Sequence, residues 1–327
     1  MTLQLWRGWS VLIGGCLAAS TALADALPQA DALNWLQRIA TAARQLNYAG
    51  TFVYQQGDTV ETSRIVHVMD GTNEIERLET LDGPRREVVR NNEIVFTYHP
   101  DSKSFRVDRR RPRRTFPQIL PDQLTAVTDH YHVKKADVER VADHDAQALI
   151  LEPKDSMRYG HKFWADANTG LLLKAKMIGE RGQVIEQFAF TQVQIGGQIS
   201  RQLLQPSMPL PAPGPSQETP QEGAAAESEW VIKSPPAGFR KIVEVRRAKD
   251  SAPPAYVTHM VLSDGLAAIS VFIEPARQKV AEGLVQRGAI NIYTRVLGDQ
   301  RITVLGEAPA VTVVTIANAL TPRSRQP

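Results

Sequence analysis

The chain has 327 residues, which is enough for two domains. Its 38 Lys and Arg residues nearly balance its 35 Asp and Glu residues, so the composition does not indicate a protein that is basic over its whole surface, as many nucleic-acid-binding proteins are. Cys16 is the single cysteine, which excludes an intramolecular disulfide and a zinc site built on cysteines.

Residues 1–24 have the layout of a bacterial secretory signal peptide. Arg7 supplies the positive charge, a short apolar run follows, and an A-x-A site ends at Ala24, directly before Asp25. The apolar run is shorter than the roughly 20 residues that a permanent transmembrane helix needs, and no later segment approaches that length. We therefore predict cleavage between Ala24 and Asp25 and a soluble, exported mature protein in the periplasm.

A second interpretation of this N-terminus remains open. Residues 13–16, Ile-Gly-Gly-Cys, loosely resemble the site at which bacterial lipoproteins are cleaved and lipidated on cysteine. The apolar core before Cys16 would then be very short and interrupted by Arg7, so we favour the soluble form. An exported protein has little access to DNA, which argues against nucleic acid as a partner.

The first element of the mature chain is predicted to be an amphipathic helix. Apolar residues recur at i, i+3, i+4 and i+7 spacing, which places them on one helix face; they are Leu33, Leu36, Ile39, Ala40, Ala43 and Leu46. Asp31 is a suitable N-cap, and Asn47 and Gly50 mark the end of the helix.

Short strands joined by tight turns follow the helix. A turn is expected at Gly57-Asp58, and the two Asx-Gly pairs, Asp70-Gly71 and Asp82-Gly83, are strong hairpin signals, so successive strands are expected to pair antiparallel. Ten strands are predicted, over residues 50–56, 59–69, 73–81, 86–90, 93–99, 131–141, 147–153, 157–166, 171–178 and 183–195. A sheet of that length must curl to bury its apolar face, so we predict a half-open β-barrel with helical segments on its concave side.

A cluster of arginines interrupts this series of strands. Its members are Arg106, Arg109, Arg110, Arg111, Arg113 and Arg114. Three interpretations are open: a solvated loop, a contact for an acidic partner segment or a phosphorylated glycolipid, and a nucleic-acid contact. We favour the second, because arginine clusters bind phosphates and carboxylates through paired donors. Residues 116–130, which follow, are predicted to form one or two short helices.

Residues 206–228 are rich in Pro, Ala, Gly, Ser and Gln without periodicity, which is typical of a linker. The linker would separate a large domain, residues 25–205, from a small domain, residues 229–322. In the small domain strands are predicted over residues 230–249, 255–264, 266–275, 289–299 and 301–307, and a closing helix over 308–322. The predicted fold class is mainly antiparallel β with helices, of the α+β type.

Aromatic residues of the large domain could line an apolar ligand cavity on the concave side of the curled sheet. The candidates are Phe52, Phe96, Phe163, Trp164, Phe188 and Phe190. Most aromatic residues of a domain belong to its ordinary core, so the lining role requires a cavity that the sequence alone does not establish.

No catalytic motif is present. G-x-S-x-G, H-E-x-x-H, a P-loop and a Rossmann glycine pattern are all missing, so we predict neither an enzyme nor a cofactor. The best metal candidate pairs His130 with His132 on one strand face, with His144 or His161 as a third ligand. Scattered histidines are more often ordinary surface residues, and we therefore predict no metal site.

Several segments, taken in order, resemble the MucB/RseB family. The most specific are YAGTFVYQ at residues 48–55, GHKFWADANTGLLLK at residues 160–174 and HMVLSDGLAAISVFIEP at residues 259–275. The resemblance covers almost the whole chain after residue 24.

The resemblance implies both a fold and a function. The large domain would be similar to the LolA/LolB lipoprotein carriers, an unclosed antiparallel barrel with helices in its concavity, and a small α+β domain would help to hold the partner. The family's role is to repress an envelope-stress sigma factor of the sigma-E/AlgU type. It does so by binding the periplasmic segment of a transmembrane anti-sigma factor of the RseA/MucA type and shielding that segment from site-1 proteolysis. Lipopolysaccharide or lipoprotein signals would release it. The resemblance assigns no individual residues.

Other functions remain as alternatives. A periplasmic lipid or lipoprotein carrier would also suit the large domain, whereas the linker and the second domain favour regulation. An envelope hydrolase lacks any nucleophile–base arrangement in the sequence. The oligomeric state is open, including a homo-oligomer.

Overall fold

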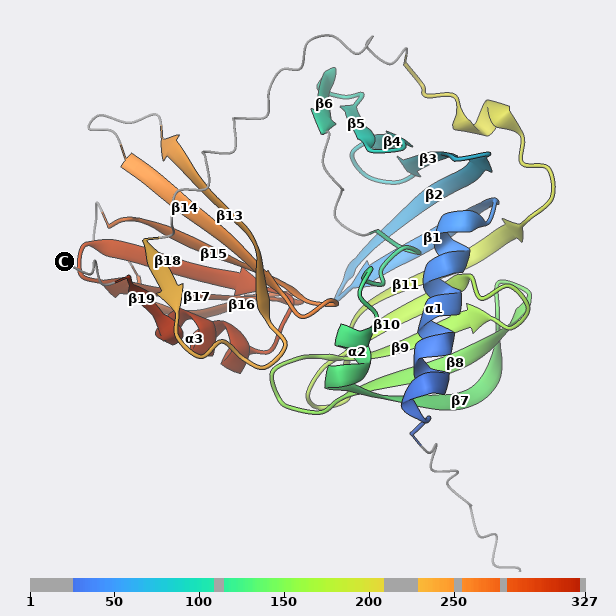
Figure 1. Cartoon of the computed structure of the whole chain (residues 1–327). Helices are drawn as coiled ribbons and strands as arrows, with labels where there is room; N and C mark the ends of the chain where they lie inside the picture. The colour runs from blue at the N-terminus through green and yellow to red at the C-terminus, as the bar shows by residue number, and fades with distance from the viewer. Residues whose placement is uncertain (1–25, 109–114, 209–228, 250–254, 277–280, 324–327) are drawn as a thin grey trace, which may run out of the picture.

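The computed structural model describes residues 26–108, 115–208, 229–249, 255–276 and 281–323 (Figure 1). Three sequence predictions therefore lie outside the described residues: the signal peptide with its cleavage site at Ala24 and Asp25, the arginines from Arg109 to Arg114, and all of the predicted linker beyond residue 208.

The large domain is built on one antiparallel sheet of eleven strands in the order β6-β5-β4-β3-β2-β1-β11-β10-β9-β8-β7. The strands are β1 (Tyr48–Gln56), β2 (Thr59–Asp70), β3 (Asn73–Thr80), β4 (Glu87–Asn91), β5 (Ile94–His99), β6 (Ser104–Asp108), β7 (Tyr131–Val141), β8 (His144–Pro153), β9 (Gly160–Asp166), β10 (Leu172–Ile178) and β11 (Val184–Ile195). The first and last strands pair at the middle, and β6 and β7 form the two edges. The predicted unclosed antiparallel barrel is thus confirmed.

Turn chemistry explains why the hairpins could be predicted. Gly57 and Gly71 have φ angles of 57° and 64°, a left-handed conformation that glycine adopts without strain. Ten of the strands match predicted segments within a few residues. The strand β6 was not predicted, because its five residues lie in the polar stretch before the arginines. It pairs with β5 through a turn in which Lys103 has a φ of 50°.

The helix α1 (Gln29–Gln45) lies across the concave face of this sheet (Figure 1). Its buried side is Ala32, Leu36, Ile39, Ala40, Ala42 and Ala43. The prediction that Asp31 caps the helix is wrong, because the N-cap is Pro28 and Asp31 lies in the first turn. Proline fixes φ near its helical value and suits a helix start, and a carboxylate in the first turn is favoured by the helix dipole.

The segment between the two halves of the sheet contains one short helix. This helix is α2 (Thr125–His130), whereas residues 116–124 are irregular. Side chains from both parts, including Phe116, Leu120, Leu124 and Val127, join the large-domain core. The segment therefore closes over the concave face together with α1.

The small domain is an antiparallel sheet of six strands in the order β13-β14-β15-β18-β17-β16, packed against α3 (Ala310–Ala319). The strands are β13 (Arg240–Lys249), β14 (Ala255–Ser263), β15 (Ala268–Pro275), β16 (Gly283–Arg287), β17 (Ile290–Leu297) and β18 (Gln300–Gly306). A separate two-stranded sheet pairs β12 (Trp230–Ile232) with β19 (Leu320–Pro322). The short 3-10 helix η1 (Arg201–Leu204) follows the large sheet.

Three predictions for the small domain need correction. The single strand expected over residues 230–249 is divided into β12 and β13 around Pro235 and Pro236, which have no N–H groups for a ladder. The exposed edge strand β16 was missed. The closing helix ends at Ala319, and the last three residues of the predicted range form β19. Within the described ranges, no helix combines the length and the apolar character needed to cross a membrane.

Candidate functional site

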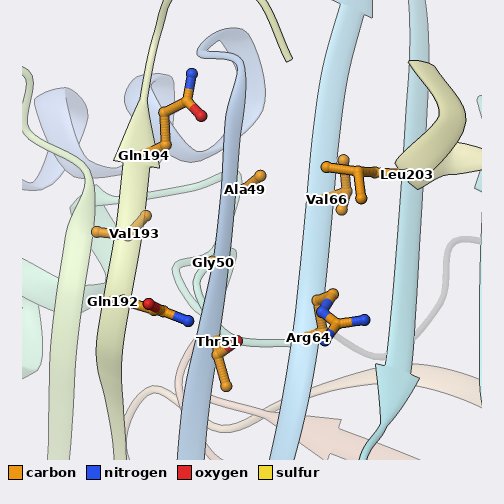
Figure 2. A pocket seen from close by; sticks show the side chains of 9 residues that line it. All are labelled: Ala49, Gly50, Thr51, Arg64, Val66, Gln192, Val193, Gln194 and Leu203. Carbon is orange, nitrogen blue, oxygen red and sulfur yellow. The ribbon is translucent and has the colours of Figure 1, made fainter. Parts of the chain in front are cut away.

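A shallow hollow lies on the convex face of the large sheet, beside η1 (Figure 2). It has a volume of about 370 Å³ and is lined by Ala49, Gly50, Thr51, Arg64, Val66, Gln192, Val193, Gln194 and Leu203. The charged group at its rim is Arg64, whose Nη1 lies 3.5 Å from Glu79 Oε2. None of the residues predicted to bind a ligand lines this hollow.

Four aromatic rings gather on the opposite, concave face. Phe52 and Phe190 meet edge to face with centroids 5.9 Å apart, and Phe188 lies 6.3 Å from Phe52. These three predicted lining residues lie close together. The fourth ring, Phe116, was not predicted: it stacks on Phe188 with centroids 5.5 Å apart and planes 7° apart.

Phe116 fills the space that the predicted cavity would occupy. Its ring also lies 5.2 Å from Phe52 and 5.1 Å from Phe190, and only 2% of Phe116 is exposed. The concave face is thus occupied by a segment of the same chain. That segment begins at Thr115, directly after the arginine cluster.

The other predicted lining residues lie elsewhere. Phe163 is fully buried near His161, with ring centroids 5.7 Å apart. Trp164 is the next residue on β9 and therefore faces the opposite side of the sheet. Phe96 lies on β5, half-buried, and is not among the four clustered rings.

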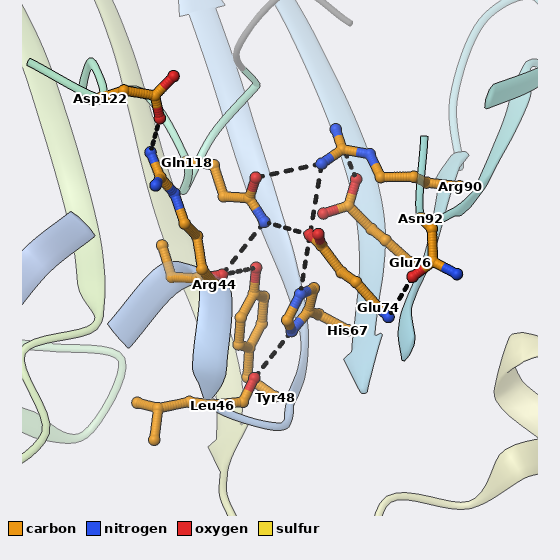
Figure 3. Close-up of polar contacts among 11 residues, drawn as sticks. Arg44, Leu46, Tyr48, His67, Glu74, Glu76, Arg90, Asn92, Gln118 and Asp122 are labelled. Atoms are coloured by element: carbon orange, nitrogen blue, oxygen red, sulfur yellow. Dashed lines mark hydrogen bonds and ion pairs between the residues drawn. The ribbon is translucent and has the colours of Figure 1, made fainter. Parts of the chain in front are cut away.

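A buried polar network holds the Phe116 segment in place (Figure 3). We call it the concave network: Tyr48, His67, Glu74, Glu76, Arg90 and Gln118. The amide Nε2 of Gln118 donates to Glu74 Oε1 at 3.0 Å and to the carbonyl of Ala43 at 3.2 Å. Arg90 Nη1 donates to Gln118 Oε1 at 3.2 Å. One side chain, two residues from Phe116, therefore joins α1, β3 and β4.

His67 connects the same network to the end of α1. Its Nδ1 donates to the carbonyl of Leu46 at 2.8 Å, and its Nε2 lies 3.2 Å from Glu74 Oε1. The ring stacks on Tyr48 with centroids 4.8 Å apart and planes 12° apart. Tyr48 in turn donates its hydroxyl to the carbonyl of Ala43 at 3.2 Å.

The two carboxylates of the concave network are shifted in opposite directions. Hydrogen bonding to His67, with further contributions from Gln118 and Arg90, lowers the pKa of Glu74 to about 2. Burial raises the pKa of Glu76, although Arg90 Nη2 lies 3.6 Å from its Oε1. Glu74 is thus held ionised, with its Oε1 close to the nitrogen donors of His67, Arg90 and Gln118.

The arginine cluster is described only at its start. Arg106 lies exposed on the edge strand β6, opposite Thr97 of β5. Arg109, Arg110, Arg111, Arg113 and Arg114 lie outside the described residues. In sequence they connect β6 to Thr115 and so immediately precede the segment that carries Phe116.

The two domains meet through a fully buried ion pair that the sequence did not suggest. Arg158 Nη1 lies 3.0 Å from Asp264 Oδ2, and both side chains have no exposed surface. Arg158 also pairs with Asp155 of its own domain at 3.0 Å and donates to the carbonyl of Ala237 at 2.6 Å. Its guanidinium lies 5.4 Å from the centre of the Phe239 ring.

Further contacts extend this domain junction. Asn291 Nδ2 donates to the Tyr159 hydroxyl at 3.0 Å, and Thr312 Oγ1 donates to the carbonyl of Met157 at 2.7 Å. Gly238 has a φ of 84°, and a Cβ there would lie 2.2 Å from the His130 ring, so only glycine fits. We define the domain junction as Met157, Arg158, Tyr159, Asp264, Asn291 and Thr312.

Glu186 lies beside the domain junction in an unfavourable charge environment. Tyr54 donates its hydroxyl to Glu186 Oε2 at 3.2 Å. Burial, together with the charge of Glu307 from the small domain, raises the pKa of Glu186 to about 7. Two carboxylates from different domains thus repel each other when Glu186 is ionised.

The predicted histidine pair is not on one strand face. His130 ends α2, whereas His132 is exposed on β7. His161 is half-buried, and the desolvation of its ring lowers its pKa to about 4. The part of the chain that the structure describes contains no group of three His, Cys, Asp or Glu side chains arranged to hold a metal.

Comparison with known families finds two matching domain models. The model of the MucB/RseB N-terminal domain matches residues 31–208, and that of the MucB/RseB C-terminal domain matches residues 224–321. The chain is 33% identical to the sigma factor AlgU regulatory protein MucB of Pseudomonas aeruginosa, over 96% of each sequence. It is 26% identical to the sigma-E factor regulatory protein RseB of Escherichia coli K12, again over 96% of each.

Solved structures agree with these sequence matches. The crystal structure of MucB in complex with MucA(peri) aligns with a TM-score of 0.72 and 29% identity, over 90% of this chain and 100% of that one. A MucA/MucB complex of Pseudomonas aeruginosa aligns with a TM-score of 0.73 and 30% identity, over 90% and 99%. A crystal structure of MucB alone aligns with a TM-score of 0.60 and 28% identity, over 90% and 98%.

Proposed function

The chain belongs to the MucB/RseB family, and from this membership we propose that it is a regulatory binding protein. Its partner would be the periplasmic segment of a transmembrane anti-sigma factor of the RseA/MucA type. By binding this segment it would shield it from site-1 proteolysis and so repress an envelope-stress sigma factor of the sigma-E/AlgU type.

The observation that carries this proposal is a structural match, over 90% of this chain, to MucB solved in complex with MucA(peri). Both domains of this chain align, in order, with MucB in its complex with MucA(peri), at a TM-score of 0.72. A carrier made of the large domain alone would not need the small domain. The buried Arg158–Asp264 pair, which fastens the small domain to the large one, supports a function that uses both.

Shielding needs no catalytic group in this chain. A protease requires access to an extended segment of its substrate, and a segment held on a folded protein is not available to it. The relatives are named regulatory proteins, which agrees with a binding function. We therefore propose a binder that acts by occupancy and not by chemistry.

We further propose that lipopolysaccharide or a lipoprotein acyl group releases the partner by acting on the Phe116 segment. Phe116 sits among Phe52, Phe188 and Phe190, where an acyl chain would find an apolar surface. The arginines before Thr115 would meet the phosphates of the same lipid. Displacement of Phe116 would break the Gln118 contacts and alter the concave face.

We also propose where the mature protein begins, where it is located and where its domains end. The mature protein would start at Asp25 in the periplasm, with a large domain over residues 25–205, a linker over 206–228 and a small domain over 229–322. A homo-oligomer is a further part of the proposal that sedimentation of the mature chain would test.

The alternative function is a periplasmic lipid or lipoprotein carrier. The observation that favours it is the apolar concave face beneath Phe116, which is the kind of surface that binds an acyl chain. A carrier would co-purify with lipid in a one-to-one ratio and would not bind the anti-sigma segment.

A binding titration tests the proposal. The mature chain, residues 25–327, is titrated with the purified periplasmic segment of the anti-sigma factor encoded in the same genome, with and without lipopolysaccharide. We expect tight binding that lipopolysaccharide weakens, and protection of the segment from site-1 protease in the bound state. Absence of binding, with lipid retained by the purified protein, would instead support the carrier.

A triple variant tests the arginine cluster in the same assay. Replacement of Arg109, Arg110 and Arg111 by Ser should weaken binding of lipopolysaccharide or of the anti-sigma segment without unfolding the protein. A matched control replaces three exposed arginines elsewhere, Arg140, Arg181 and Arg201. Unchanged affinity for both ligands in the first variant would mean that the cluster is a solvated loop.

A further inference from the structure

A second group of positive charges lies on the convex face of the large sheet, away from the arginine cluster. Lys162 on β9 and Lys174 on β10 each place Nζ 4.6 Å from the centre of the Trp164 ring, and Lys176 Nζ lies 5.7 Å from it. The strand register explains this convergence, because Lys174 is paired with Trp164 and Lys176 with Lys162. We call these four residues the lysine platform.

The lysine platform has more positive than negative charge. Lys162 Nζ lies 2.9 Å from Glu139 Oε1. For Lys174 and Lys176, no carboxylate of the described residues lies within ion-pair distance. Three ammonium groups within 6 Å of one ring centre thus share one carboxylate, so the platform retains two uncompensated positive charges.

The structure holds these charges together against their repulsion. Burial and the neighbouring charge of Lys176 lower the pKa of Lys174; Lys162 acts in the same direction, and Glu139 opposes it. Trp164 is only 2% exposed and forms a fixed aromatic base beneath the three amines. An anion placed above them would relieve the repulsion.

We propose that Lys162, Lys174 and Lys176 over Trp164 form a binding site for a phosphate group. Lysine offers point charges on flexible stems, which suit a compact anion with several oxygens, whereas a planar carboxylate is better matched by the paired donors of arginine. The site lies on the face opposite the Phe116 cluster. It does not depend on the proposed regulatory function, because it concerns anion binding alone.

The test uses the mature chain and two phosphate sources. Pyrophosphate is titrated calorimetrically near neutral pH, and vesicles of phosphatidylcholine with phosphatidic acid are compared with phosphatidylcholine alone. The test variant is Lys174→Gln/Lys176→Gln. The control is Lys134→Gln. Lys134 lies on β7, on the same face of the sheet as Lys162, and is already paired with Glu152 at 2.8 Å.

We expect the double variant to bind phosphate at least about tenfold more weakly than the wild type, and the control variant to bind it unchanged. Both variants should have the melting temperature of the wild type. Phosphate binding should also raise the pKa of the Lys174 amine, measured by NMR, because an adjacent anion favours the charged form. Binding to pyrophosphate would show that a soluble phosphate is sufficient for binding at the platform. Binding only to phosphatidic acid vesicles, lost in the double variant, would identify a lipid headgroup as the ligand. Failure to bind either probe, or equal binding by the double variant, would overturn the proposal.

Discussion

Buried charge joins two domains at the domain junction, whereas in the concave network it fixes one segment within a single domain. At the junction, Arg158 pairs with Asp264 across 106 residues of sequence, and neither side chain touches solvent. In the concave network, Gln118 mediates between Arg90 and Glu74, and 26% of the Glu74 side chain is exposed. The junction is therefore the more sensitive to losing one partner, because a buried charge that is left alone has no access to water.

The largest expected effect comes from breaking the junction. Asp264→Ala leaves Arg158 with Asp155 alone in a buried site, which should cost about 3–5 kcal/mol of unfolding free energy or separate the domains. Chemical denaturation monitored by fluorescence, together with small-angle scattering, distinguishes the two results. The replacement Asp155→Ala is the matched comparison, because Asp155 is partly exposed and belongs to the same domain as Arg158. Equal small losses of unfolding free energy in both variants would show that the buried Arg158–Asp264 pair is no more sensitive to losing a partner than a partly exposed pair.

Removing the ring that fills the concave face should have the next largest effect. Phe116→Ala leaves a cavity among Phe52, Phe188 and Phe190, and we expect a loss of about 3 kcal/mol. Domain arrangement measured by scattering should remain that of the wild type. Binding of a fatty acid to the variant but not to the wild type would identify Phe116 as the occupant of a lipid site. A stable variant that binds nothing would show that the segment is only loosely held.

Local patterns explain which parts of these two regions could be predicted. The first two hairpins of the large sheet follow from the glycine-containing turns at Gly57-Asp58 and Asp70-Gly71 and from alternating residues, so the curled meander and its concave apolar face were correctly predicted. The edge strands β6 and β16 were missed because each has only five residues and lacks a regular alternation that would mark a buried face. Sequence patterns detect elements that bury a face, and these two strands bury little.

The decisive contacts of the Phe116 segment, the domain junction and the lysine platform could not be predicted from the sequence. Phe116 lies in an irregular segment without periodicity, and its partners come from β1 and β11. The junction joins Arg158 to Asp264 of a separate domain, a pairing that no local spacing encodes. The lysine platform depends on the β9–β10 register, which sets Lys174 opposite Trp164. Long-range register and domain contact decide all three.

An acid titration tests the concave network alone. Glu74 has a folded-state pKa of about 2, below its ordinary value of 4.5, so its ionised form stabilises the fold above pH 4.5. That stability is lost as the pH falls from about 4.5 toward 2. Glu74→Gln should lose about 2 kcal/mol at neutral pH and flatten this acid dependence. The measurement is unfolding free energy against pH; a variant with the wild-type acid slope would contradict the assignment.

The smallest expected effect is a gain of stability, and it comes from Glu186, which lies beside the domain junction. Glu186 keeps its proton up to about pH 7 when folded but loses it near pH 4.5 when unfolded, so its contribution to stability is greatest below pH 4.5 and declines as the pH rises to about 7. Glu186→Gln removes the repulsion by Glu307 and keeps an acceptor for Tyr54. We expect the variant to gain about 1 kcal/mol at pH 8 and nothing at pH 4.

The control for this gain is Glu307→Gln, which removes the other carboxylate of the pair. If the two carboxylates repel each other across the junction, this variant should lower the pKa of Glu186, followed by NMR of its side-chain carboxyl. It should also recover part of the same stability at pH 8. A Glu186 pKa that stays near 7 would instead assign the whole shift to burial. The junction would then be a site where charge is buried, and not one where the two domains oppose each other.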